Sequence, residues 1–121
     1  MIIDFKNTAP ANAEHFKGGD GTAIIRKFED ESNKIMLFTL PSGASVGVHS
    51  HEGNSEIIYL LEGSGSAFDG KEWTPVKAGA CLYCAEGQTH GLRNDGDRDL
   101  VFFAVVPEHH LKQPASTQPS Q

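Results

Sequence analysis

Four side chains of the types that commonly bind metal ions stand in two short segments of this chain. The first segment carries His49, His51 and Glu56, and the second carries His90. Residues i and i+2 of a β-strand share a face and lie about 6.6 Å apart, so His49 and His51 can point at one position. The turn-forming residues 52–55 reverse the chain, and Glu56 then opens the next strand opposite the histidines.

The second segment is expected to bring His90 to the same position. A glycine turn at Gly87 separates two stretches with strand character, so His90 falls at the start of a strand. Three imidazoles and one carboxylate suit one divalent transition-metal ion, with Mn, Fe, Ni, Co and Zn all open. Four protein ligands would complete a structural tetrahedral zinc site, whereas a six-coordinate ion would keep two positions open for a reactive ligand.

Short strands separated by turns account for most of the chain, and no helical period of useful length is present. Asp69-Gly70 is the best two-residue hairpin turn. Alternating and β-branched patterns predict strands at 22–29, 34–40, 46–51, 56–62, 64–68, 71–73, 80–85, 89–94 and 100–106. Such a series of short strands predicts an all-β sandwich or barrel.

The predicted strands divide the chain into one domain with two flanking segments. Residues 22–107 are expected to form the β-barrel, and residues 1–21 to form an irregular N-terminal segment. Residues 108–121 are expected to be a disordered C-terminal tail, because residues 112–121 are rich in Pro, Ser and Gln and lack an aliphatic anchor.

Both metal-ligand segments resemble the two sequence motifs of the cupin superfamily, G(X)5HXH(X)3–4E(X)6G and G(X)5PXG(X)2H(X)3N. The first motif is matched at every fixed position, and fifteen residues separate it from the second. The second motif departs once, because Ala85 stands where the family usually has proline. The matching positions are Gly43, His49, His51, Glu56, Gly63, Gly79, Gly87, His90 and Asn94.

This resemblance implies a double-stranded β-helix, the jelly-roll-like barrel of a small single-domain cupin. It also implies that His49, His51, Glu56 and His90 are the metal ligands and that the protein is a homodimer, as cupins frequently are. It implies no single reaction, because the fold hosts dioxygenases, isomerases, lyases, epimerases and non-catalytic binding proteins.

Two functions from different classes fit these residues. The first, which we favour, is a metal-dependent enzyme acting on a small oxygen-bearing organic substrate that coordinates the open metal positions. The alternative is a non-catalytic cupin module that binds a small ligand or the metal alone. The sequence identifies no catalytic residue and no further cofactor-binding residue. The pocket wall is expected to be apolar with few charged groups, and its candidate members are Met36, Phe38, Ile58, Leu60 and Leu92.

The composition limits the classes of partner that the protein is expected to bind. The net charge is −6 and no basic stripe is present, so a nucleic-acid partner is not expected. No apolar run approaches the ~20 residues of a membrane helix, and residues 1–4 show no secretory signal, so we expect a cytoplasmic protein. The residues 57–61 and 100–103 are apolar on both strand faces, which independently favours a homodimer.

Cys81 and Cys84 have the C-x-x-C spacing of some redox pairs. Their segment has strand character, and residues three apart on a strand point to opposite faces. We therefore expect both cysteines to be buried or half-buried packing residues.

Overall fold

A computed structural model of the protein describes residues 1–109. None of these residues belongs to a helix long and apolar enough to cross a membrane. Two 3-10 turns are present, η1 (Phe5–Asn7) and η2 (Phe16–Gly18). The strands are β1 (Ala11–Glu14), β2 (Thr22–Glu29), β3 (Asn33–Leu40), β4 (Ser45–Ser50), β5 (Glu56–Glu62), β6 (Ser64–Phe68), β7 (Trp73–Lys77), β8 (Cys81–Cys84), β9 (Thr89–Arg93) and β10 (Leu100–Pro107).

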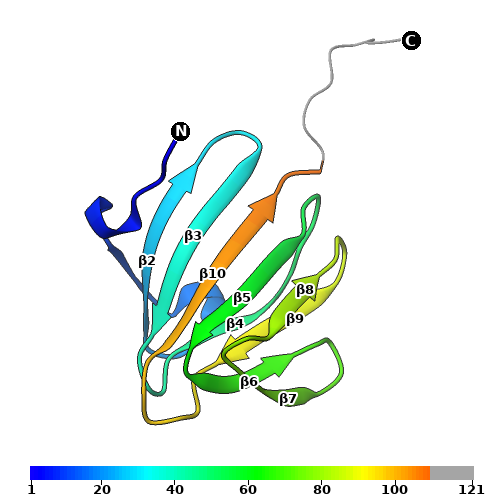
Figure 1. The fold of residues 1–121 in the computed structure, drawn as a ribbon. Coiled ribbons are helices and arrows are strands. Elements are labelled where there is room, and N and C mark those ends of the chain that lie inside the picture. The colour runs from blue at the N-terminus through cyan, green and yellow to red at the C-terminus, as the bar shows by residue number, and fades with distance from the viewer. Residues whose placement is uncertain (110–121) are drawn as a thin grey trace.

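The strands form two antiparallel sheets, which confirms the all-β prediction (Figure 1). The larger sheet has the order β1-β2-β3-β10-β5-β8, and the smaller has the order β4-β9-β6-β7. The first metal-ligand segment spans both sheets, because β4 belongs to the smaller sheet and β5 to the larger. The turn between β4 and β5 therefore connects the two layers next to the predicted site.

The core lies between the two sheets and is filled by every second side chain of the strands. On β10, alternate residues are buried from one end to the other. Leu100, Phe102 and Ala104 are each at most 1% exposed, and Phe102 stacks on Phe38 of β3 with ring centroids 4.8 Å apart. On β5, Ile58 and Leu60 point inward in the same way. These apolar contacts hold the layers together and fix the strands that carry the site.

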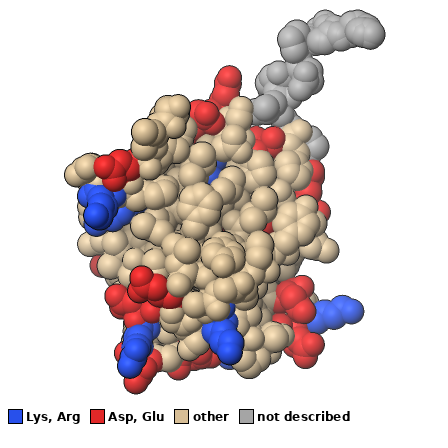
Figure 2. All heavy atoms as spheres, viewed as in Figure 1, with Lys and Arg blue, Asp and Glu red and all other residues tan. Residues whose placement is uncertain are grey.

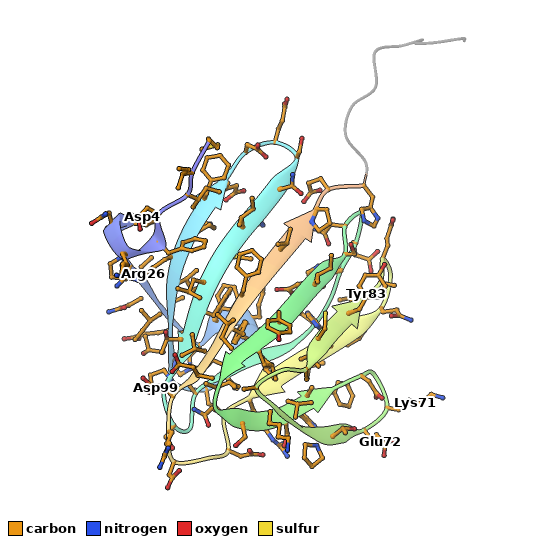
Figure 3. All side chains as sticks on the ribbon, viewed as in Figure 1. Asp4, Arg26, Lys71, Glu72, Tyr83 and Asp99 are labelled. Atoms are coloured by element: carbon orange, nitrogen blue, oxygen red, sulfur yellow. The ribbon has the colours of Figure 1, made fainter. Side chains whose placement is uncertain are left out.

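The N-terminal segment is more regular than predicted. Within residues 1–21, β1 pairs with β2 from Ala11↔Ile25 to Glu14↔Thr22. The sequence of β1, ANAE, has little intrinsic strand preference, so the unpaired edge of β2 determines its conformation. Arg26 on β2 also holds this segment by donating hydrogen bonds to the carbonyl oxygens of Phe5 and Thr8 (Figure 3).

The first two residues of the predicted tail are in contact with the barrel. Glu108 forms an isolated β-bridge with Asn54, and the His109 amide donates to the Gly53 carbonyl at 2.9 Å. The remainder of the predicted tail, residues 110–121, lies outside the described residues. The last described residues therefore lie against the β4–β5 turn.

The hairpin after β6 differs from the prediction. Its loop contains the four residues Asp69–Glu72 and not Asp69-Gly70 alone, and the first strand pair beyond it is Phe68↔Trp73. The predicted strand at 71–73 is replaced by β7, which contains Pro75. A proline has no amide to donate, and β7 tolerates it because it is the edge strand of the smaller sheet.

The two cysteines are free thiols on opposite faces of β8. Cys84 is buried, as predicted, and its burial together with the nearby Glu56 charge raises the pKa of the thiol. Cys81 is exposed, so its predicted packing role is wrong: β8 is the edge strand of the larger sheet, and within residues 1–109 no further strand covers the outer side.

Candidate metal centre

The structure brings the four predicted ligands together at one end of the barrel. His49 lies on β4 directly opposite His90 on β9, His51 follows β4, and Glu56 begins β5. One ligand atom from each side chain lies within 4.8 Å of the other three. His51 and Glu56 are buried, and the other two side chains are half-buried. The cluster thus unites both sheets around one point.

Backbone hydrogen bonds fix the segment that carries His51 and Glu56. The His51 amide donates to the Gln88 carbonyl at 3.1 Å, and the Gly87 amide donates to the His51 carbonyl at 2.6 Å. These bonds tie the β4–β5 turn to the turn that precedes His90. The two sequence segments are therefore positioned by each other, which explains why both are needed for one site.

The distances within the cluster fit a shared metal ion. The Glu56 Oε1 atom lies 3.0 Å from the Nε2 atoms of His51 and His90. His90 Nε2 lies 3.1 Å from His51 Nε2 and 3.3 Å from His49 Nε2. With metal–ligand bonds of about 2.1 Å, adjacent ligand atoms of an octahedron are about 3.0 Å apart and those of a tetrahedron about 3.4 Å. The donor set and its spacing can therefore hold a transition-metal ion.

The His49 and Glu56 ligand atoms also lie within 4.8 Å of each other. All four side chains could therefore contact one ion, and an ion of higher coordination number would have positions left for a small ligand.

Hydrogen bonds at the far ring nitrogens orient two of the histidines. His49 Nδ1 lies 2.7 Å from the Gly47 carbonyl, and His51 Nδ1 lies 2.7 Å from Asn54 Oδ1. Each Nδ1 must donate to these oxygens, which leaves the Nε2 lone pair free to bind a metal. Asn54 is itself held by its amide nitrogen, which donates to Glu108 at 3.2 Å. Sequence analysis missed this support for His51, because Glu108 is distant in sequence.

The electrostatics of the cluster favour an ionised carboxylate among imidazoles. Burial opposes ionisation of Glu56, but the hydrogen bonds from His51 and His90 outweigh it and lower its pKa from 4.5 to about 2. The hydrogen bond to Glu56 in turn raises the pKa of His51. Burial lowers the pKa of His49, so this imidazole stays neutral, as a metal ligand must be.

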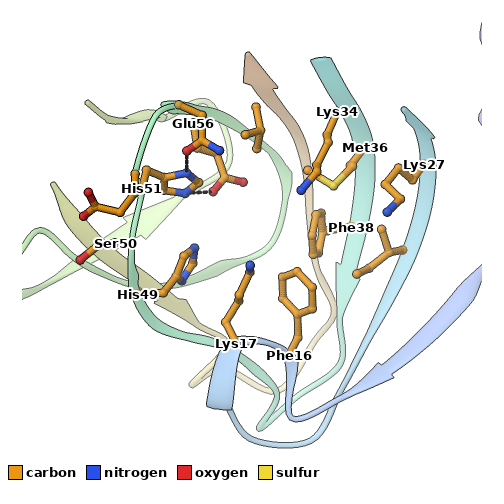
Figure 4. A pocket seen from close by; sticks show the side chains of 14 residues that line it. Phe16, Lys17, Lys27, Lys34, Met36, Phe38, His49, Ser50, His51 and Glu56 are labelled. Atoms are coloured by element: carbon orange, nitrogen blue, oxygen red, sulfur yellow. Dashed lines mark hydrogen bonds and ion pairs between the residues drawn. The ribbon is translucent and has the colours of Figure 1, made fainter. Parts of the chain in front are cut away.

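A cavity of about 340 Å³ opens beside His49, His51 and Glu56 (Figure 4). Met36 and Phe38 line it, as predicted. The other predicted wall residues lie in the closed core instead, because their side chains point into the space between the two sheets and do not line the cavity. These core residues are Ile58, Leu60 and Leu92.

The prediction of few charged groups in the wall is wrong. Lys17, Lys27 and Lys34 all line the cavity. For Lys34 a signal exists in the sequence, because it shares the inward face of β3 with Met36 and Phe38. Lys17 lies in a glycine-rich turn that carries no periodic signal.

The fold and the cluster define a small two-sheeted β-barrel with a possible histidine and carboxylate metal site. A family model for the cupin domain matches residues 36–106, and the chain belongs to this family. The chain is also 37% identical over 112 residues to the oxalate-binding protein of Thermotoga maritima, covering 88% of this chain and 93% of that protein.

Solved structures agree with this assignment. A predicted oxalate decarboxylase from Thermotoga maritima superposes with a TM-score of 0.84 and 31% identity, covering 89% of this chain and 99% of the other. A double-stranded β-helix protein from Klebsiella pneumoniae has a TM-score of 0.72 and 21% identity, with 92% of each chain covered, and supports the fold alone. The predicted double-stranded β-helix of a small cupin is confirmed.

Proposed function

We propose that this cupin binds one divalent transition-metal ion through His49, His51, Glu56 and His90, and that the bound ion holds a small carboxylate such as oxalate. The observation that carries the proposal is the convergence of four ligand atoms within 4.8 Å beside an open cavity. When bound, the ion supplies a Lewis acid that attracts anionic oxygen ligands.

The surroundings of the cluster support an anionic ligand. Lys17 and Lys34 add positive charge to the cavity, and Glu56 is the single acidic group in the ligand set. The protein of Thermotoga maritima that is 37% identical is named for binding oxalate. A carboxylate that chelates through two oxygens would use the two positions that a six-coordinate ion keeps open.

Metal analysis and calorimetry test this proposal. We expect close to one transition-metal ion per chain after incubation with Mn, Fe, Co, Ni or Zn salts and removal of excess metal. Oxalate should then bind the metal-loaded protein and not the chelator-treated protein, with acetate as the control that cannot chelate through two carboxylates. Equal oxalate affinity in both forms would show that the metal, if present, is structural.

Catalysis is the second candidate, because ionisable groups outside the ligand set face the same cavity. Glu52 and Lys34 line it and are available to hold or deliver a proton. Decarboxylation would convert hydrogen oxalate into carbon dioxide and formate: the carbon–carbon bond breaks, and a proton adds to the remaining carboxylate carbon. Formate production by the metal-loaded protein tests this function, and oxalate binding without formate would assign the protein to the binding class.

A homodimer fits the outer face of the larger sheet. Figure 2, drawn from the side of this sheet, shows a largely uncharged surface with charged side chains around its rim. Tyr83, on β8 (Figure 3), is 65% exposed, and Ile57 beside it is 41% exposed. The apolar residues of this face include Ile35, Leu37, Ile57, Tyr59, Leu61, Tyr83, Phe103 and Val105.

We expect two chains to bury this face about a two-fold axis, because a single chain leaves it in contact with water. Light scattering should give twice the chain mass of 13.1 kDa. Tyr59→Asp should shift the protein towards the single-chain mass. A wild-type mass of one chain at micromolar concentration would contradict the dimer.

A further inference from the structure

Two lysine ammonium groups face the cavity without an ion-pair partner. Lys17 and Lys34 extend towards the space beside the histidines (Figure 4), and among residues 1–109 neither forms an ion pair. Lys27 lines the same cavity, but its Nζ atom lies 3.1 Å from Glu29 Oε1. Lys17 and Lys34 thus present ammonium groups to the cavity, whose acidic lining residue outside the ligand set is Glu52, while Glu29 acts on Lys34 electrostatically without forming an ion pair with it.

The backbone around Lys17 holds it in this position. Lys17 and His15 both have left-handed backbone conformations, with φ of 54° and 53°, which are uncommon for residues with a side chain. Such conformations cost free energy and persist only where the surrounding structure imposes them. The Gly18 amide donates to the His15 carbonyl at 2.8 Å, and His15 Nδ1 lies 3.0 Å from the Gly19 carbonyl.

A close backbone contact joins this turn to the metal-ligand strand. A Cβ atom on Gly47 of β4 would lie 2.1 Å from the Lys17 carbonyl oxygen, and one on Gly19 would lie 2.3 Å from the Ser45 carbonyl oxygen. Only glycine at both positions permits this approach. Since Gly47 also accepts the hydrogen bond from His49, the turn carrying Lys17 and the strand carrying His49 form one unit.

Lys17 is close enough to the cluster to influence it electrostatically. Glu56 raises the pKa of His51, and the charge of Lys17 opposes this rise. Lys34 approaches from the other sheet, at the end of the inward face of β3. Apolar side chains line the same cavity, and Phe16 packs edge-on against Phe38 with ring centroids 5.5 Å apart.

The cavity is larger than oxalate requires. The six non-hydrogen atoms of oxalate fill less than about 180 Å³ even at the ~30 Å³ that one water molecule occupies in the liquid. The cavity measures about 340 Å³. Oxalate chelating a metal ion would also place both of its charges at the ion and leave the lysines without a partner. The space and the charge both fit a longer ligand.

We propose that Lys17 and Lys34 form a second anion subsite, which selects a four- or five-carbon dicarboxylate with an oxygen next to its first carboxylate. The first carboxylate and this neighbouring oxygen bind at the metal, the carbon chain crosses the cavity, and the distal carboxylate binds the two ammonium groups. This inference rests on the metal-dependent carboxylate binding proposed above.

Calorimetric titration of the manganese-loaded protein tests the subsite with two matched compounds. Malate carries the distal carboxylate, and 2-hydroxybutanoate has the same carbon chain with a methyl group instead. Charge-assisted hydrogen bonds to partly exposed lysines should make malate bind about tenfold more tightly, and less so at high salt. Lys17→Gln and Lys34→Gln should each reduce this preference and change 2-hydroxybutanoate binding much less. Lys27→Gln, the matched control in the same cavity, should retain it.

Titration with oxalate shows whether the second subsite fails alone or together with the proposed function. If oxalate binds only the metal-loaded protein while malate and 2-hydroxybutanoate bind equally, the second subsite is refuted and the metal site stands. The same conclusion follows if Lys17→Gln and Lys34→Gln both keep the wild-type preference. If none of the three compounds distinguishes metal-loaded from metal-free protein, the proposed function fails as well.

Discussion

Replacement of Glu56 by glutamine tests the candidate metal centre most directly, because the amide keeps the size of the side chain and removes its charge. Lowering the pKa of the carboxyl from 4.5 to about 2 corresponds to about 3 kcal/mol of stabilisation of the ionised form in the metal-free protein. The amide can still hydrogen-bond to one histidine, so Glu56→Gln should cost about 2 to 3 kcal/mol in the presence of chelator at pH 7.

The pH dependence of this loss has a definite sign. The folded protein holds Glu56 at a lower pKa than the unfolded chain does, so its contribution is complete above pH 4.5 and disappears as the pH falls towards 2. The difference in unfolding free energy between wild type and Glu56→Gln in chelator should therefore shrink over this range.

Metal should widen the difference between the two proteins. A metal at a thousandfold excess over its dissociation constant stabilises the wild type by about 4 kcal/mol, and a hundredfold weaker site in Glu56→Gln leaves about 1.4 kcal/mol. At about 4 °C for each kcal/mol, metal should raise the melting temperature by about 15 °C in the wild type and about 5 °C in the variant.

Differential scanning calorimetry with and without metal measures both values. Glu52→Gln is the matched control, because Glu52 lines the same cavity and lies outside the four-residue cluster. Equal metal-induced shifts in wild type and Glu56→Gln would refute the assignment of Glu56 as a ligand. A loss in Glu52→Gln as large as in Glu56→Gln would refute the ligand set as a whole.

Three further outcomes are expected. Metal affinity should fall about tenfold per pH unit below the raised pKa of His51, because the ion must displace the proton that His51 then carries. Competition with a chelating dye between pH 8 and 5.5 measures the affinity, and an affinity that does not change with pH contradicts the prediction. Asn54→Leu removes the acceptor for His51 Nδ1 and should weaken metal binding about 10- to 100-fold in the same titration, whereas unchanged affinity would show that Asn54 does not orient the ring. Gly47→Ala forces a Cβ atom against the backbone and should lower the free energy of unfolding in urea by about 1 to 3 kcal/mol. The control Gly96→Ala, whose added Cβ atom would meet no atom closer than 3.5 Å, should be nearly neutral. Equal stability of the two variants would mean that the N-terminal turn is not packed on β4.

The barrel strands and the candidate ligands could be predicted because both depend on local patterns. Alternation places Ile58 and Leu60 on the inward face of β5, whose predicted bounds of 56–62 agree with the structure. The spacing of His49 and His51, followed by a turn, is enough to aim three side chains at one point. The fourth, His90, required the second motif, since pairing between β4 and β9 cannot be deduced from alternation.

The features that were missed depend on contacts between distant parts of the chain. The strand β1 exists because β2 offers an unpaired edge, and β7 accepts Pro75 because it is itself an edge. Lys34 could have been recognised from its inward position on β3. Lys17 could not, because its place in the cavity follows from the contact of its backbone with Gly47.

The residues that line the cavity come from two different parts of the chain. The segment matched by the cupin family model, residues 36–106, contains all four candidate metal ligands but begins after Lys17, Lys27 and Lys34. A chain shortened to this segment would keep the ligand set and lose every lysine of the cavity. Under the proposed two-subsite binding, substitutions ahead of residue 36 would change the ligand preference of this protein and leave its four candidate metal ligands unchanged.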